Sequence, residues 1–316
     1  MMRHLLVFSL VWLAAFTSSA CAAQFTVEQD EHGVTVRQDG QLFARYLVKS
    51  GTKPIVWPLI GPSGKEMTRG YPMRAADEKE KSDHVHQRSC WFTHGDVNGI
   101  SFWAEQGACG TINHREFLEV RGGERAVVRA RNDWAGSRGE LICRDVRKLT
   151  FACDEEARWI DFEITVTAGD NDVVFGDTKE GSFGLRVAGS MNVDRREGGK
   201  IVNSEGQTNE DAWGKRAAWV DYSGPVDGET VGVAILDHPK SLRYPTYWHV
   251  RTYGLFAANP FGVRDFLGTN AASGALKVES GTSFSLFYRV VLHRGDEKTG
   301  KIDERFRQYA AQEVGK

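Results

Sequence analysis

The sequence predicts an all-β fold, a large antiparallel β-sandwich or an enlarged version of it with two broad sheets, followed by one C-terminal helix. Three observations lead to this prediction. Short runs of alternating apolar and polar residues recur along the chain, and period-two alternation is typical of half-buried strands. Turn-forming pairs such as Asp39-Gly40 separate the runs. Nine Trp and seventeen Phe among 316 residues supply the bulky side chains of a large β core.

Residues 1–23 have the composition of a secretory signal peptide. A short basic start precedes an apolar run at 5–16, and small residues at 20–23 offer a cleavage site. We therefore expect an exported protein, periplasmic or secreted. The residues at 18–21 also resemble a bacterial lipobox without its leucine, so a lipid anchor at Cys21 stays open as the alternative. No later stretch is apolar enough to predict a membrane span.

Residues 24–316 are expected to form a single β-sandwich domain, because no linker and no clear internal repeat divides them. The formal net charge of −2 gives no sign of a nucleic-acid partner. The oligomeric state stays open.

Four cysteines follow the signal segment, and export permits disulfides between them. Four cysteines allow three pairings. Cys143 and Cys153 flank a short segment that resembles a hairpin, which favours them as a pair over Cys90 and Cys109. The chain has no C-x-x-C, which argues against a structural zinc knuckle.

The first strands are expected at 25–28, 34–37 and 42–48, as a meander joined by turns. Residues 53–72 are rich in proline and glycine, which disfavours a central strand. We predict that 53–72 form an ordered loop, a common way to deliver functional groups.

Further strands are expected after this loop, and only the end of the chain has helical spacing. In 159–166, polar Asp161, Glu163 and Thr165 alternate with apolar residues, which predicts one buried face and one wet face. A helix is predicted at 298–312. The remaining predicted strands are 100–105, 117–120, 126–134, 139–151, 159–168, 173–176, 182–187, 217–222, 230–236, 247–253 and 283–293.

Residues 83–99 carry the clearest functional signal, with three of the nine histidines. If the segment is extended, His84, His86 and Arg88 share one face at intervals of about 6.6 Å. Two imidazoles on one face suit a divalent metal ion. They also suit proton transfer near neutral pH, with Arg88 holding an anionic group. His94 is a further candidate.

A second cluster follows from the alternation His249-x-Arg251-x-Tyr253, which on a strand would place the three side chains together. Arg251 is a second candidate for an anion clamp. His249 would enter the pocket of His84 and His86 from another strand, as the third ligand of one divalent metal ion. Whether a metal binds, and which, stays open.

A third group lies in a loop bounded by glycines. Asp177 and Glu180 could act as acid and base or complete a metal shell. Lys179 between them also fits a solvated loop charge. His238 resembles part of a capped turn.

Each cluster has a structural alternative, since alternation alone produces polar strand faces. Four aromatic residues fit either the core or a surface that stacks on a sugar ring: Trp91, Phe102, Trp103 and Trp248. The sequence contains no G-x-S-x-G, P-loop, dinucleotide fingerprint or H-E-x-x-H, so serine-hydrolase and nucleotide chemistry have no support.

Several stretches resemble a bacterial family known as methane oxygenase PmoA, and the resemblance covers nearly all of residues 24–316. Gln87 stands where members of that family carry another histidine. The chain lacks the membrane spans of true particulate methane oxygenase subunits, so the resemblance does not imply methane oxidation. The stretches that carry the resemblance are 57–62, 83–99, 176–184, 247–254 and 259–262.

Members of this family resemble exported proteins of bacteria that degrade polysaccharides, which implies carbohydrate as the partner, or another small molecule. The first hypothesis is an exported carbohydrate-active hydrolase, lyase or epimerase with a His/Arg/carboxylate pocket. The second is a non-catalytic carbohydrate-binding β-sandwich, and the third a metal-dependent oxygenase. The candidate catalytic residues of the first are His84, His86, Arg88, His94, Asp177, Glu180, His249 and Arg251.

Overall fold

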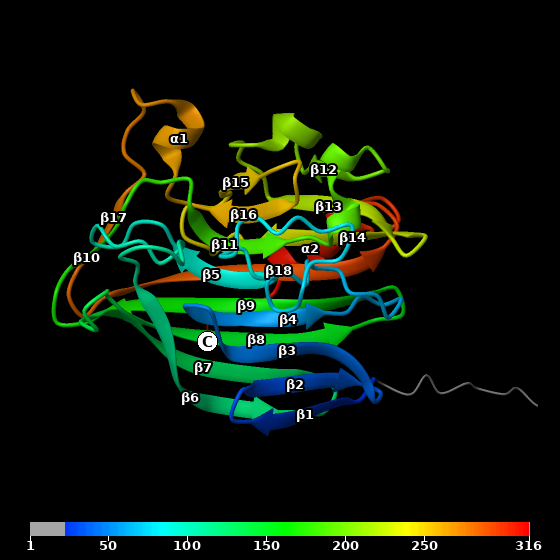
Figure 1. Cartoon of the computed structure of the whole chain (residues 1–316), viewed down its shortest axis with the longest axis horizontal. Coiled ribbons are helices and arrows are strands. Elements are labelled where there is room, and N and C mark those ends of the chain that lie inside the picture. The colour runs from blue at the N-terminus through cyan, green and yellow to red at the C-terminus, as the bar shows by residue number, and fades with distance from the viewer. Residues whose placement is uncertain (1–22, 316) are drawn as a thin grey trace, which may run out of the picture.

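Two stacked, eight-stranded antiparallel sheets form the protein (Figure 1), seen in a computed structural model that describes residues 23–315. Strands make up 49% of the structure, about twice the average of roughly 20–25% for globular proteins. The predicted all-β sandwich is therefore confirmed. The predicted signal peptide and the alternative lipid anchor at Cys21 lie outside the described residues.

In the first sheet, the N-terminal meander is continued by strands from the middle and the end of the chain. Its strands, in spatial order, are β1 (Phe25–Asp30), β2 (Gly33–Gln38), β3 (Gln41–Ser50), β4 (Lys53–Leu59), β5 (Cys90–His94), β11 (Gly181–Arg186), β16 (Leu255–Asn259) and β15 (Tyr247–Val250).

The second sheet has longer strands and a continuous register between neighbours over most of its width. Its strands, in spatial order, are β12 (Lys200–Asn203), β13 (Trp219–Val226), β14 (Glu229–Asp237), β18 (Ser283–Arg294), β9 (Ala157–Ala168), β8 (Leu141–Cys153), β7 (Ala126–Ala135) and β6 (Thr111–Arg121).

A few short elements complete the fold. Strands β10 (Val173–Phe175) and β17 (Leu276–Val278) pair with each other. The helices are α1 (Val263–Leu267) and α2 (Ile302–Ala310), and three single turns of 3₁₀ helix lie at Gly189–Met191, Val193–Arg195 and Asn209–Ala212. No helix within residues 23–315 is long and apolar enough to cross a membrane.

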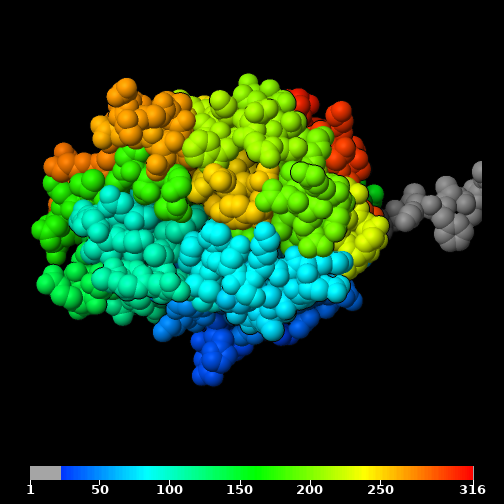
Figure 2. Space-filling view, turned by 45° about the horizontal axis from the view of Figure 1, so that its top comes forward, coloured from blue at the N-terminus to red at the C-terminus, as the bar shows by residue number. Residues whose placement is uncertain are grey.

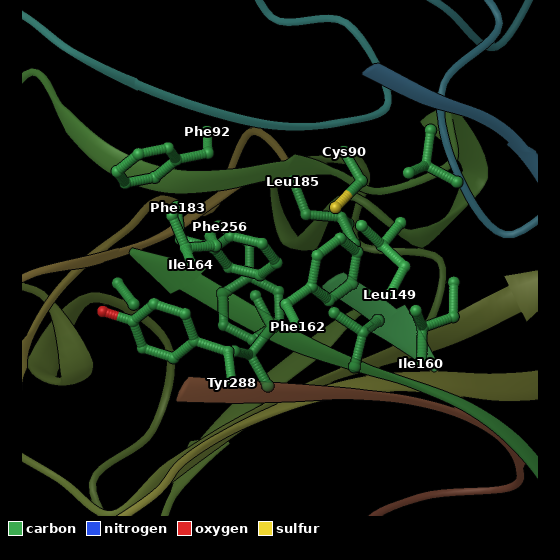
Figure 3. Packing of buried hydrophobic residues seen from close by; sticks show 14 of the residues in the cluster. Cys90, Phe92, Leu149, Ile160, Phe162, Ile164, Phe183, Leu185, Phe256 and Tyr288 are labelled. Carbon is green, nitrogen blue, oxygen red and sulfur yellow. The ribbon is translucent and has the colours of Figure 1, made fainter. Parts of the chain in front are cut away.

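The core lies between the inner faces of the two sheets (Figure 3). Phe183 of the first sheet packs edge-on against Phe162 of the second at 4.8 Å and stacks on Tyr288 at 4.9 Å. The wet face predicted for β9 is present, since its buried side chains alternate with partly exposed Asp161 and Glu163. Aromatic pairs of this kind stabilise the contact between the two sheets by more than the burial of their apolar surface alone.

The predicted C-terminal helix is confirmed as α2, shorter than expected. Its Ile302 and Tyr309 are buried against the outer face of the second sheet, where they contact an apolar cluster that includes Trp219 and Leu236.

Two local predictions were wrong. Residues 53–59 form β4 although they contain Pro54 and Pro58, because both prolines sit where the register between β3 and β4 shifts and no regular ladder needs their N–H. Residues 101–110 form an irregular loop. The apolar residues Phe102 and Trp103, which suggested a strand, are buried and anchor this loop.

The predicted disulfide between Cys143 and Cys153 is absent, and the cysteines of residues 23–315 are free. The supposed hairpin is the single strand β8, which contains both residues. Ten residues of strand separate them by about 33 Å, whereas a disulfide needs Cα atoms within about 7 Å.

The outer face of the first sheet positions the candidate site. Side chains of β4, β5 and β16 form an apolar layer there, with Trp103 of the 101–110 loop packed on it; the layer includes Ile55, Trp91, Leu255 and Ala257. Figure 2 shows chain near residues 250–260, in gold, exposed between the cyan and green segments that surround it.

Candidate functional site

His84 and His86 lie on a turn, so the prediction that residues 83–89 alternate as a strand was wrong. His84 has a left-handed backbone with φ of 43°, and the strand β5 begins only at Cys90. The turn nevertheless brings the two imidazoles together, with ring centroids 5.7 Å apart. His84 and His86 are therefore neighbours, as expected, but a turn and not a shared strand face brings them together.

A buried arginine from another segment holds this turn in place. Arg69 is 1% exposed and donates hydrogen bonds to the carbonyls of Lys81, Asp83, His84 and Gln87 and to the carboxylate of Asp83. Five donors on a planar group suit this task, since each backbone carbonyl of an irregular loop needs a partner.

Gln87 has a structural role beneath the turn. Its amide oxygen accepts a hydrogen bond from Arg186 of β11, and its amide nitrogen lies 3.5 Å from the Tyr253 hydroxyl. Arg186 in turn lies 4.6 Å from the centre of the Tyr253 ring, and this ring stacks on His84 at 5.3 Å. Gln87 therefore positions Arg186 and Tyr253, and Tyr253 supports the His84 ring.

Arg88 lies close to the histidines but is already neutralised. Its guanidinium makes three hydrogen bonds to the Glu105 carboxylate, at 2.7–3.0 Å, and one to Ser50. Glu105 also accepts from the buried ammonium of Lys53 at 2.6 Å. Arg88 is thus part of a Lys–Glu–Arg group next to the site, and the expected anion clamp is not free there.

His249 faces the same side of the first sheet from the edge strand β15. Its side chain is 3% exposed, and Nδ1 donates to the Lys179 carbonyl at 2.8 Å. That bond fixes the tautomer and leaves Nε2 as an acceptor. Burial lowers the pKa of His249 to about 4, against the opposing field of Glu180, so the imidazole is neutral at pH 7.

Glu180 connects the two histidine groups. Its carboxylate acts electrostatically on both His86 and His249, raising the pKa of each, and it pairs with Lys179 at 2.8 Å. Burial, then the positive charge of Lys53, lowers the pKa of His86 to about 4. The imidazole of His86 makes no hydrogen bond to any residue in 23–315, so its nitrogens are available.

Arg251 lies just beyond β15, on the turn 251–254, so the predicted common strand face with His249 was wrong: the strand ends at Val250. The guanidinium is 5.9 Å from the ring centres of both Trp213 and Tyr253. It is exposed to solvent.

Two predicted site residues are structural. His94 is fully buried, with Nε2 2.8 Å from the Gly176 carbonyl and Nδ1 3.2 Å from the Ser182 hydroxyl. Asp177 accepts hydrogen bonds from the backbone N–H groups of Arg264 and Gly274. Each is used to join neighbouring segments: both ring nitrogens of His94 are bonded, and both carboxylate oxygens of Asp177 accept backbone N–H groups.

The predicted metal-ligand set is not assembled. Within residues 23–315, no three side chains of His, Cys, Asp or Glu come together in a way that could hold a metal ion. His84 and His86 are neighbours, but no third donor, His249 included, lies close enough to both to complete such a group. The donors present therefore do not fit a shared divalent ion.

Sequence reasoning missed several residues of this surface. Trp213 reaches it from the loop after Asn209–Ala212, and Arg69 and Arg186 reach it from distant segments. None lies in a run with a recognisable spacing, so no local signal could identify them. Trp103, whose role was left open, is a buried neighbour of His86, with ring centroids 6.0 Å apart.

A sizeable hollow lies away from the candidate site. It has a volume of about 560 Å³, lies on the outer side of the second sheet, beneath the C-terminal segment, and is lined by residues such as Lys148, Asp161 and Tyr309. Its lining lacks histidine, and Asp161 there is paired with Arg289. The candidate site is therefore identified by its converging acid–base groups and not by enclosed volume.

No curated protein matches the chain. Solved structures with a related arrangement include an α-galactosidase from Lactobacillus brevis (8% identity, 87% of this chain and 40% of that one, TM-score 0.41). Others are an α-galactosidase from Geobacillus stearothermophilus (9%, 93% and 42%, 0.39) and a galactose mutarotase-like protein from Lactobacillus casei (8%, 85% and 100%, 0.36). The chain thus spans about two fifths of either α-galactosidase.

A family model, by contrast, matches most of the sequence, from residue 33 to residue 307. The chain belongs to this family, a family of unknown function designated DUF6807.

Proposed function

We propose that the protein is an exported carbohydrate-active enzyme whose acid–base groups are His86, Glu180 and His249. The observation that carries the proposal is the convergence of these groups on one face of the first sheet, with Glu180 acting on both imidazoles. Two neutral histidines and one carboxylate can accept and return protons of a bound hydroxyl or carbon acid. Export is part of the proposal and rests on the apolar run at 5–16.

Within this class, the contacts favour a lyase or epimerase over a hydrolase. Glycoside hydrolysis commonly uses two carboxyl groups that flank the bond. Of the carboxylates near the site, Glu105 is bound by Lys53 and Arg88, and Asp83 is bound by Arg69 and Arg186. Asp177 holds backbone N–H groups. Glu180 pairs with a single cation, Lys179, and it is the one of these carboxylates that acts on both His86 and His249, which fits a carboxylate–imidazole mechanism.

The two alternatives have less support. A metal-dependent oxygenase, suggested by the PmoA resemblance, would require a ligand group that residues 23–315 do not provide. A non-catalytic carbohydrate-binding module would account for the aromatic rings of Tyr253 and Trp103. It would give no reason for the ring nitrogens of His86 and His249 near Glu180 that stay unbonded within residues 23–315.

Removal of the acid–base groups tests the proposal. Glu180→Gln and His249→Ala should each lower turnover of a substrate, found by screening an oligosaccharide panel, by at least about 100-fold. His84→Ala should have a smaller effect, because His84 is paired with Asp83 at 3.3 Å. His32→Ala is the matched control, since its side chain is 73% exposed on the distant β1–β2 turn.

Circular dichroism of each variant excludes misfolding as the cause. Turnover that survives both the Glu180→Gln and the His249→Ala change would contradict the proposed acid–base role. Binding of oligosaccharides without any turnover by the unmodified protein would support the binding-module alternative instead.

A further inference from the structure

Arg251 is a cation without an anionic partner at the centre of the candidate surface. Within residues 23–315, its guanidinium makes no hydrogen bond and no ion pair, and its contacts are the ring faces of Trp213 and Tyr253. An arginine between aromatic rings keeps its planar donors directed outward, where they match a carboxylate or sulfate in bidentate geometry.

The neighbouring carboxylates are occupied and do not neutralise Arg251. Glu180 pairs with Lys179, and Asp265 accepts the backbone N–H of Lys179 at 2.6 Å. Lys179 and Arg251 both act on His249 as positive charges. The charges of these four groups balance, and Arg251 is the one that has neither a hydrogen bond nor an ion pair within residues 23–315.

A row of rings extends from Arg251 in both directions. On one side, Tyr253 stacks on His84, which contacts His86, which contacts Trp103, with centroid separations of 5.3, 5.7 and 6.0 Å. On the other side, Trp213 contacts Phe266 of α1 at 5.5 Å. Trp103 is buried, whereas Tyr253 and Trp213 are half-buried, so sugar units can contact the row at Tyr253 and Trp213.

Unpaired donors accompany these rings. The indole N–H groups of Trp103 and Trp213 are buried and have no hydrogen-bond partner among residues 23–315. Buried donors of this kind are normally satisfied. Both nitrogens are shielded from solvent, so a ligand on this surface would have to displace neighbouring atoms to reach them.

We propose that the site takes an acidic oligosaccharide, whose carboxylate or sulfate group binds Arg251 while neighbouring sugar units lie against Tyr253 and Trp213. This inference rests on the proposed function and adds its substrate class. It accounts for an exposed guanidinium that has no anionic partner within residues 23–315 and lies near two half-buried rings, a cation that a neutral sugar would leave unused.

Calorimetric titration of the full mature chain tests the proposal. The probes are a tetragalacturonate, a neutral galactotetraose and a sulfated galacto-oligosaccharide of the same length. We expect at least one acidic probe to bind at least about 10-fold more tightly than the neutral one. Arg251→Gln should weaken that binding by about 10–100-fold, the range for a charged hydrogen bond, and leave the neutral probe within about 2-fold.

Two further variants make the result specific. Arg251→Lys keeps the charge but loses the bidentate geometry, so it should recover only part of the affinity. Arg138→Gln is the matched control, because the Arg138 side chain is 88% exposed on the β7–β8 turn. The preferred acidic probe separates carboxylate from sulfate recognition.

Equal affinity for all three probes, absence of binding to any of them, or equal loss of acidic and neutral binding in Arg251→Gln would overturn the inference. Failure of the proposed function has a different signature. Turnover of neutral sugars that needs Glu180 but not Arg251 rejects the inference alone. Binding of acidic sugars through Arg251, without any effect of Glu180→Gln on turnover, rejects the proposed catalysis alone.

Discussion

At the scale of single residues, partners decide whether a polar side chain serves structure or chemistry. His94 and His86 belong to the same short segment, and burial lowers the pKa of each to about 4. Yet His94 uses both ring nitrogens within the protein, while His86 has none bound within residues 23–315. The sequence identified both as candidates, and only the surrounding segments distinguish them.

Asp237 at the end of β14 offers a residue-scale prediction about pH. Its carboxyl is fully buried and accepts the N–H of Thr246, and burial raises its pKa from 3.8 to about 7. The folded protein therefore holds this proton more tightly than the unfolded chain does. The resulting stability is complete below about pH 3.8 and is lost as pH rises through 7.

Asp237→Asn removes this titration. Between pH 5 and pH 8, the free energy of unfolding of the unmodified protein should fall by about 3 kcal/mol relative to that of the variant. Urea unfolding at a series of pH values measures the difference. Parallel pH profiles for the two proteins would show that Asp237 is ionised throughout.

At the scale of elements, periodicity predicted most strands but few of the irregular segments. Long strands such as β8 and β9 are predictable because apolar and polar residues alternate over more than ten positions. β4 was missed because its prolines fall at register shifts. The site turn at 83–89 was mistaken for a strand because its shape comes from Arg69, a residue outside it.

The dependence of this turn on Arg69 is testable. Arg69→Lys keeps a charge but cannot reach all the acceptors on the turn, and buried charges left without partners are costly. We expect a loss of about 2–4 kcal/mol in the free energy of unfolding. Amide hydrogen exchange should accelerate at Gln87, whose N–H bonds the His84 carbonyl.

Arg74→Lys is the control for this change, because Arg74 lies in the same loop region with its side chain 39% exposed. Exchange at the strands of the second sheet should be unaffected in both variants beyond the change in global stability. Unaltered protection of Gln87 in Arg69→Lys would show that the turn is stable without this arginine.

At the scale of the whole molecule, the sandwich was predictable and the assembly of the site was not. Alternation determines which face of each strand is buried, and therefore which side chains form the core. It says nothing about which strands become neighbours. β5, β11 and β16 lie side by side, although they come from positions 90, 181 and 255, and this non-local pairing brings Glu180 and His249 to the turn of His86.

The same arrangement keeps the cysteines apart, which gives a prediction for the whole chain. Protein comprising residues 24–316, exported to an oxidising compartment and purified without reductant, should contain four free thiols. In denaturant, iodoacetamide should modify all four. In the folded protein, reaction should be confined to the partly buried Cys109 and Cys153, because burial of Cys90 and Cys143 excludes the reagent and raises their pKa.

Mass spectrometry counts the modified thiols, and a fully reduced sample provides the reference. The thermal midpoint should also be unchanged by reductant, since no disulfide restricts the unfolded chain. Uptake of only two groups in denaturant would reveal a disulfide and would require strands to pair differently. Cys143 and Cys153 in particular cannot join while β8 is one continuous strand, because strand geometry holds them about 33 Å apart.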